Sequence, residues 1–181
     1  MKNNTNSQTV SAQPRATIKL AMTAVMSALI AVTTVTAIPM PPPLSTITLA
    51  PIVIFVAGIL MGPIPALISS IIGSGLGFLG GATIGSISVP PGFMGVFLLG
   101  IVVARGPMGF TVGLLRKTDE VAAMTAGVLV ETAIFFFMDW YLFGFEVALI
   151  VLGTLIDLVF VPFGYLVLKA VKKMWDVTTL E

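Results

Sequence analysis

The feature that most constrains this chain is a series of long apolar segments separated by short connections of proline, glycine or charged residues. Six such segments cover about residues 17–38, 49–61, 64–80, 93–115, 121–143 and 147–168. Only 9% of the 181 residues are charged and 57% are hydrophobic, whereas a soluble domain carries roughly 25% charged residues. We therefore expect an all-α membrane protein, a bundle of six transmembrane helices.

Prolines define the second segment on both sides. Pro39 and Pro41–Pro43 oppose helix and favour an extended path, after which Thr48 can cap a new helix with Pro51 in its first turn. A helix that ends before Gly62-Pro63 is about 20 Å long, shorter than a hydrocarbon core of about 30 Å. It must begin below the outer interface or continue through Gly62-Pro63 with a kink.

The basic residues indicate the orientation in the membrane. If both termini are cytoplasmic, one side carries all of Arg15, Lys19, Arg116, Lys117, Lys169, Lys172 and Lys173. The opposite connections, residues 39–48, 81–92 and 144–146, contain no lysine or arginine. Short cytoplasmic connections are enriched in these residues, so we predict a multi-pass protein of the cell membrane with both termini in the cytoplasm.

The ends of the chain differ from its middle in composition. Residues 1–16 are polar and poor in apolar side chains, and we expect a disordered cytoplasmic tail there. Residues 17–173 form the predicted membrane domain, and residues 174–181 form a second cytoplasmic tail. A cleaved signal peptide is disfavoured, because its apolar core is only about 7–15 residues long.

Three ionisable residues fall near the middle of predicted spans: Arg105, Glu131 and Asp157. A charge at the bilayer centre costs about 2.5–3.5 kcal/mol, so such groups normally face the protein interior and pair. One interpretation is structural, with Arg105 pairing with either acid to hold three helices together. The other is functional, with the three groups acting as polar ligands for a solute or as a relay. Pro107 also predicts an interrupted helix beside Arg105.

Asp139, Trp140 and Tyr141 lie near the outer end of the fifth segment. Aromatic residues at this depth commonly form an interfacial belt. The alternative is an aromatic platform with a carboxylate, which suits a planar heterocycle.

Small residues recur at helical spacing in two segments. Ala21, Ala24, Ala28 and Ala31 form a stripe on the first, and Gly73, Gly77, Gly81 and Gly85 form a ridge on the third. Small residues allow helices in lipid to approach closely. The alanine stripe packs either within this chain or against another membrane subunit.

Several function classes are disfavoured by what the sequence lacks. There is no cysteine and no histidine, which removes thiolate zinc sites, HExxH sites and Ser-His-Asp chemistry. No GxxxxGK[ST] motif occurs, and the GxGxxG pattern of Gly75–Gly80 lies inside an apolar segment without the strand that a dinucleotide site requires. We expect no enzyme activity, no cofactor and no metal, and a net charge of +1 does not favour nucleic acid.

The proline loop followed by LAPIVIFVAGILMGPIPALISSIIG, the alanine stripe and six short spans resemble the substrate-binding S component of energy-coupling-factor (ECF) transporters for vitamins. The similarity is best over Lys19–Leu79. It implies a high-affinity binding subunit for a vitamin or related micronutrient, partnered by a membrane T component and two ATPase subunits. It also implies that Ala24 and Ala28 dock the T component and that the loop with Pro41, Pro42 and Pro43 closes over the solute.

Within this hypothesis Arg105 would hold an anionic group, Glu131 and Asp157 would accept hydrogen bonds from the solute, and Trp140 would stack on it beside Asp139. The sequence does not name the solute. A stand-alone secondary transporter or channel acting as an oligomer remains the alternative, with Glu131 and Asp157 as proton sites. A membrane enzyme of lipid metabolism fits poorly, because paired acidic DDxxD motifs and histidine are absent.

Overall fold

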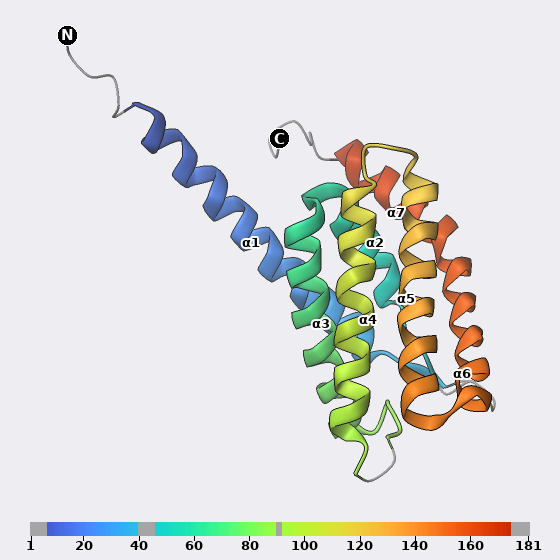
Figure 1. Cartoon of the computed structure of the whole chain (residues 1–181). Coiled ribbons are helices and arrows are strands. Elements are labelled where there is room, and N and C mark those ends of the chain that lie inside the picture. Colours follow the sequence, from blue (N-terminus) through green and yellow to red (C-terminus); the bar gives the residue numbers. More distant parts are fainter. Residues whose placement is uncertain (1–6, 40–45, 90–91, 175–181) are drawn as a thin grey trace.

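The computed structural model describes residues 7–39, 46–89 and 92–174, which form a helical bundle with one short hairpin (Figure 1). The elements in chain order are α1 (Ser7–Val35), β1 (Ile38–Pro39), β2 (Thr46–Ile47), α2 (Ala50–Met61), α3 (Pro63–Ile84), α4 (Met94–Leu114), α5 (Glu120–Phe143), α6 (Phe145–Val151), the 3₁₀ helix η1 (Leu152–Val159) and α7 (Phe160–Met174).

Five helical segments are long and apolar enough to cross a membrane: Ala16–Val35, Pro63–Ile84, Met94–Leu114, Glu120–Phe143 and Phe145–Met174. The prediction of a helical protein with several helices fit to span a membrane is therefore confirmed. The sixth predicted span is α2, which has 12 residues and a length of about 18 Å. By length alone α2 cannot cross a bilayer, so the count of six spans remains a prediction.

The short helix α2 is the core of the bundle. It contacts α1, α3, α4 and α7, and Ile54, Phe55 and Ala57 are fully buried. A helix that is apolar on all sides is stable only when other elements surround it. Pro51 lies in its first turn as expected, and the longer helices shield it from lipid.

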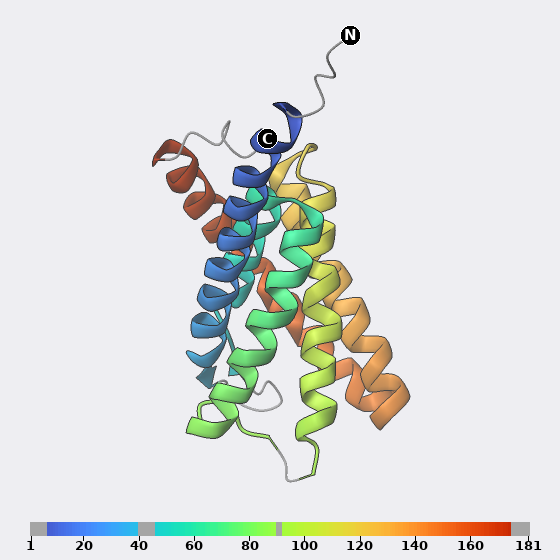
Figure 2. The same cartoon turned by 90° about the vertical axis from the view of Figure 1, so that its left-hand side faces the viewer.

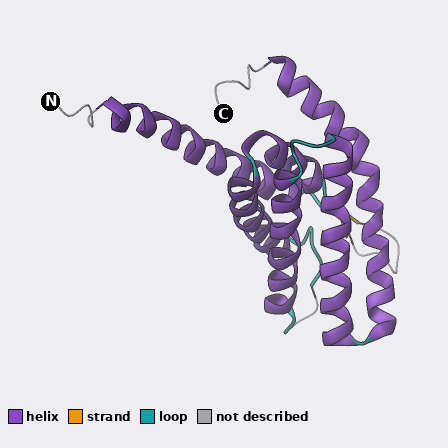
Figure 3. Ribbon diagram, turned by 45° about the horizontal axis from the view of Figure 1, so that its top comes forward, coloured by secondary structure: helices purple, strands orange, loops and turns teal. Residues whose placement is uncertain are grey.

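Helix α1 packs on the glycine ridge of α3 and then diverges from the bundle. A Cβ atom built on Gly77 would lie 2.5 Å from the Cβ of Thr34, and one on Gly73 would lie 2.6 Å from the Cβ of Ile30. These distances leave no room for a side chain at either glycine. The side chains of α1 therefore pack directly against the backbone of α3. Figure 2 shows α1 beside α3, and Figures 1 and 3 show the N-terminal half of α1 projecting away from the other helices.

One end of the bundle is closed by short connections. β1 pairs with β2 in antiparallel register, with Ile38 opposite Ile47, so the proline loop begins and ends in a two-stranded hairpin. Pro41, Pro42 and Pro43 lie outside the described residues. Gly85 ends α3 in the left-handed conformation, with φ of 82°, and the Ser86 hydroxyl donates to the Val35 carbonyl at 2.7 Å.

The opposite end of the bundle carries the basic residues. The α4–α5 turn with Arg116 and Lys117 lies at the same end as the C-terminal part of α7 (Figure 1). There Lys172 donates to Glu120 across the gap between α7 and α5. The clustering agrees with the charge pattern of the sequence, while the side of the membrane that this end faces remains a prediction.

Three local predictions differ from the structure. Helix α1 begins at Ser7, so the helix takes in much of the segment expected as a disordered tail. Helix α4 continues through Pro107, because the loss of one backbone hydrogen bond does not end a helix whose neighbours hold it on both sides. Thr48 does not cap α2: the N-cap position is Leu49, which makes no side-chain cap hydrogen bond.

The last apolar segment is not the continuous helix that we predicted over about residues 147–168. It changes from α6 to the 3₁₀ helix η1 at Leu152 and returns to α-helix at Phe160. Pro162 has no N–H to donate to the Leu158 carbonyl and its ring crowds that carbonyl. The tighter winding of η1 ends just before this proline and contains Asp157.

Candidate functional site

Arg105 is the centre of a buried polar cluster in the middle of the bundle. Its Nε donates to Oε1 of Glu131 at 3.3 Å, Nη1 donates to the Thr34 hydroxyl at 3.2 Å and Nη2 donates to the Thr48 hydroxyl at 2.7 Å. The residue is only 8% exposed. One side chain on α4 therefore joins α1, α5 and the segment between β2 and α2.

Arg105 pairs with Glu131, which is one of the two acids that the structural interpretation of the sequence allowed. Both residues lie about 11 positions into helices that run in opposite directions, α4 from Met94 and α5 from Glu120, so they meet at the same depth. Glu131 is 2% exposed. The guanidinium neutralises the Glu131 carboxylate at close range. The pair can therefore be buried at a depth where a single unpaired charge would be strongly disfavoured.

Glu131 keeps one oxygen without a partner. Its Oε2 atom is buried and accepts no hydrogen bond from any residue that the structure describes. A carboxylate oxygen buried in this way loses its hydration without compensation, which is costly. An acceptor is therefore available at the centre of the protein.

Asp157 is the third ionisable residue of this region. It lies on η1, is partly buried, and is close enough to Glu131 and Arg105 to interact electrostatically with both. The neighbouring turn of η1 is held to α5 by the Thr154 hydroxyl, which donates to the Thr132 hydroxyl at 3.0 Å. The three ionisable residues singled out in the sequence thus belong to one region, with two carboxyl groups and one guanidinium.

Asp139 and Trp140 lie elsewhere on α5. Trp140 is about nine residues beyond Glu131, or roughly 13 Å along the helix, and it is 48% exposed. It packs edge-on against Phe145, with ring centroids 5.7 Å apart, and stacks on Phe137 at 6.3 Å. Asp139 is partly buried beside it. This aromatic group is not in the Arg105 cluster, and it lies between that cluster and the end of α5.

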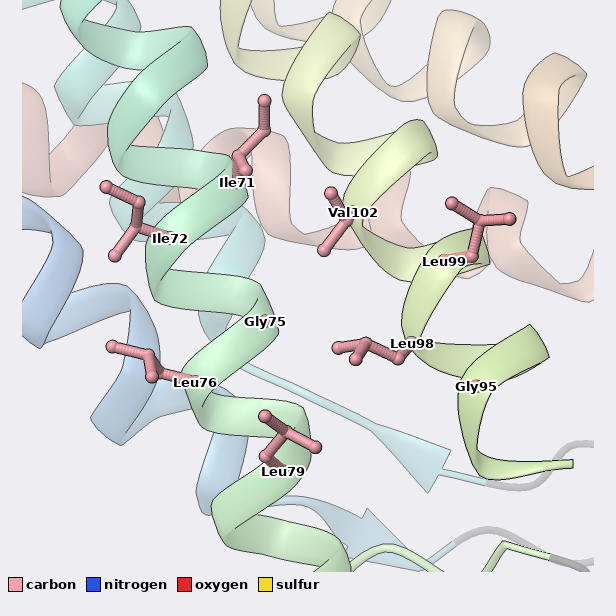
Figure 4. A pocket seen from close by; sticks show the side chains of 9 residues that line it. All are labelled: Ile71, Ile72, Gly75, Leu76, Leu79, Gly95, Leu98, Leu99 and Val102. Atoms are coloured by element: carbon pink, nitrogen blue, oxygen red, sulfur yellow. The ribbon is translucent and has the colours of Figure 1, made fainter. Parts of the chain in front are cut away.

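A groove of about 700 Å³ lies between α3 and α4. Its side chains are aliphatic, and they include Ile71 and Leu76 on α3 and Leu98 and Val102 on α4 (Figure 4). It offers no charged or hydroxyl group to a polar solute. The groove suits hydrocarbon chains, and it is distinct from the charged cluster.

Ala24 and Ala28 are exposed on α1. The face of α1 that packs within the chain is instead made of larger and hydroxyl-bearing side chains: Thr23, Met26, Ser27, Ile30 and Thr34. Ala24 and Ala28 therefore lie on a different side of the helix from the packed face, whereas Ala31 of the same stripe lies against Gly77 of α3. In this chain Ala24 and Ala28 make a smooth surface with no covering helix among the described residues.

Sequence reasoning missed Thr34 and Thr48 as partners of Arg105. Thr34 lies in an apolar segment, where a hydroxyl usually bonds to its own helix, and it does donate to the Ile30 carbonyl at 2.8 Å. Only its second role, as an acceptor for Arg105, belongs to the cluster. Thr48 was interpreted as a helix cap because of its position before Pro51. A buried arginine needs several hydrogen-bond acceptors. That requirement predicts hydroxyl groups close to Arg105, although it does not identify which ones.

Comparisons with protein-family models, curated proteins and solved structures gave no match to this chain.

Proposed function

We propose that this chain is the membrane-embedded, high-affinity solute-binding subunit of an ATP-driven importer of the ECF type, with a vitamin or related micronutrient as its solute. The single observation that carries the proposal is the Arg105 cluster. It combines buried charges and a free acceptor at membrane depth with a direct bond to the base of the outer hairpin. Intramembrane ionisable residues are rare outside solute and ion pathways.

The hydrogen-bond network supports a binding mechanism. Arg105 joins Glu131 in the interior to Thr48, which follows β2 directly. A solute that binds to Glu131 is therefore connected through Arg105 to the base of the hairpin. In this proposal, occupancy of the interior is linked in this way to the loop that the hairpin carries. Replacing Pro41, Pro42 and Pro43 with alanine should then speed solute release, and an unchanged release rate would reduce the loop to a connector.

The energy source is a separate set of subunits in this proposal. The sequence contains no P-loop, so the chain needs ATPase partners to concentrate a solute. The exposed small side chains of Ala24 and Ala28 would allow a helix of a membrane T component to approach, and two ATPase subunits would attach to that component. Close approach of small-residue faces is the common mode of helix association in lipid.

Both termini are cytoplasmic in this proposal, and the absence of cysteine makes the orientation simple to test. Single cysteines at Ser86 and Thr118, which lie in connections at opposite ends of the bundle, serve as probes in whole cells. We expect an impermeant maleimide to label the Ser86→Cys protein from outside and the Thr118→Cys protein only after lysis. The reverse pattern would invert the topology and contradict the proposal.

The alternative function is a stand-alone secondary transporter. The observation that favours it is the pair of membrane-depth acids, Glu131 and Asp157, beside a helix that changes to 3₁₀ winding. Broken helices with acids bind coupling ions in such transporters.

Uptake in cells separates the two functions. Solute accumulation that stops when the co-expressed ATPase carries an inactivating Walker-motif substitution supports the importer subunit. Accumulation in liposomes that contain this chain alone, driven by an ion gradient, would support the secondary transporter and overturn the proposal.

A further inference from the structure

We infer that the solute presents a protonated nitrogen to the free oxygen of Glu131, and that Arg105 is a structural tie instead of an anchor for an anion. The inference rests on the proposed function, since it names the chemical class of the solute that this cluster would bind. It also reverses the role that the sequence suggested for Arg105.

The first step is that Arg105 is already bound by the protein. Its three nitrogen atoms each donate to a protein oxygen, on Glu131, Thr34 and Thr48. The side chain is 10% exposed. These bonds use three of its five N–H groups, and the Glu131 carboxylate already compensates its positive charge. A second anion would compete with Glu131 for that charge, so Arg105 acts as a tie between helices.

The second step is the unmatched acceptor. Oε2 of Glu131 is buried and has no partner in the described part of the chain, while Oε1 is held by Arg105. The glutamate is thus fixed in place with one oxygen free. A carboxylate oxygen bonds most strongly to a charged N–H donor. Glu131 has the properties of a fixed acceptor that lacks only its donor.

The third step is the balance of charge. Glu131 and Asp157 bring two formal negative charges to the cluster and Arg105 brings one positive charge, and the three groups interact. With both acids ionised, one positive charge is missing. A cationic ligand supplies it, whereas an anionic ligand doubles the imbalance at a depth where uncompensated charge is strongly disfavoured.

The rings on α5 and α6 favour the same ligand class. Phe136 is about five residues beyond Glu131 toward the end of α5, and its ring lies 6.1 Å from those of both Trp140 and Phe145. Aromatic faces attract cations, by about 0.5–1 kcal/mol at exposed sites. Phe136 and Trp140 lie on α5 between Glu131 and the end of the helix.

The test uses matched pairs of small compounds: aminomethyl-pyridines and aminomethyl-pyrimidines, each with its N-acetylated counterpart. Acetylation removes the positive charge and keeps an N–H donor. Stabilisation of the purified full chain in lipid nanodiscs is read from its melting temperature. We expect at least one free amine to raise the melting temperature, and its acetylated counterpart to raise it less.

Variants assign the effect to the cluster. Glu131→Gln keeps an oxygen for the Arg105 Nε donor and removes the charge, and we expect it to weaken amine binding by about ten- to a hundredfold. Asp157→Asn should weaken it less, because Asp157 is only partly buried. Glu146→Gln is the matched control on an exposed acid near the start of α6, and it should bind the amine as the wild type does.

Several results would overturn the inference. These are no stabilisation by any amine, equal stabilisation by an acetylated partner, equal stabilisation by sodium or potassium ions alone, or unchanged binding in Glu131→Gln. If that variant does not fold, the mass of the solute that co-purifies with the wild type decides. A retained solute without a cationic nitrogen refutes this inference and leaves the proposed function standing, whereas no retained solute counts against both.

Discussion

Replacing Arg105 should lower the free energy of unfolding more than replacing its partner Glu131. Replacing both residues should lower it by less than the sum of the two single effects. In Arg105→Met, Glu131 becomes a buried carboxylate with no donor, and two threonine hydroxyls lose theirs. Breaking a buried ion pair costs about 3–5 kcal/mol, and hydrogen bonds within membranes average about 0.6 kcal/mol each. We expect Arg105→Met to lower the free energy of unfolding by about 4 kcal/mol.

The double variant isolates the ion pair. Glu131→Gln still accepts from Arg105, so it should cost about 1–2 kcal/mol. Arg105→Met combined with Glu131→Gln buries no unpaired charge from this pair and should cost about 2 kcal/mol. The expected coupling energy is therefore about 3 kcal/mol. We would measure it by unfolding in mixed micelles with increasing dodecyl sulfate, followed by helical circular dichroism.

A matched control is available at the charged end of the bundle. Glu120 and Lys172 also join two helices, but they are partly exposed, and exposed pairs contribute about 0.2–1 kcal/mol. The same cycle with Lys172→Met and Glu120→Gln should give a coupling energy in that range. A coupling energy for Arg105 and Glu131 no larger than that of the control pair would refute the reasoning about the buried cluster.

The remaining predictions concern single contacts. Gly77→Ala should lower the free energy of unfolding in micelles by about 1–3 kcal/mol, because its Cβ would lie 2.5 Å from a threonine Cβ on α1. Gly95→Ala is the control, because its Cβ would meet nothing within 4 Å, and it should leave the stability unchanged. Equal effects of the two substitutions would contradict the close contact at Gly77. Thr48→Val should cost about 1 kcal/mol by removing an acceptor of the central guanidinium, whereas Thr125→Val, whose hydroxyl bonds only within its exposed helix turn, should change little. Ala24→Trp should leave the stability of the isolated chain within about 0.5 kcal/mol and reduce ATP-dependent uptake; unchanged uptake would argue against docking at this exposed position.

Much of the architecture could be predicted because lipid restricts backbone structure so strongly. Apolar stretches of span length, with glycine, proline or charge between them, can hardly be anything but helices in a membrane protein. The depth of Arg105 in its segment was enough to suggest a pair with Glu131 or Asp157, and only the fold identifies Glu131 as the partner. The glycine ridge of Gly73 and Gly77 predicted a close helix contact, although the sequence did not identify α1 as the helix that uses it.

The differences come from tertiary packing, which local patterns do not encode. Pro107 predicts an interruption, yet neighbouring helices hold α4 continuous around it. Pro162 is the same kind of signal, and there the chain does change its winding, over Leu152–Val159. Thr48 illustrates the difficulty for sites. Its position suggested a helix cap, but a buried arginine from a distant segment takes its hydroxyl oxygen, and only the assembled fold brings the two together.

The most direct test of the central claim is native mass spectrometry of the purified chain, released from nanodiscs without any partner subunit. The account predicts a complex of one chain with one small molecule that survives extensive washing. It also predicts that titration of the identified molecule back into stripped protein gives sub-micromolar affinity. A chain that carries only lipid, and that binds no solute from an extract of its host, would contradict the account of this protein as a solute-binding subunit.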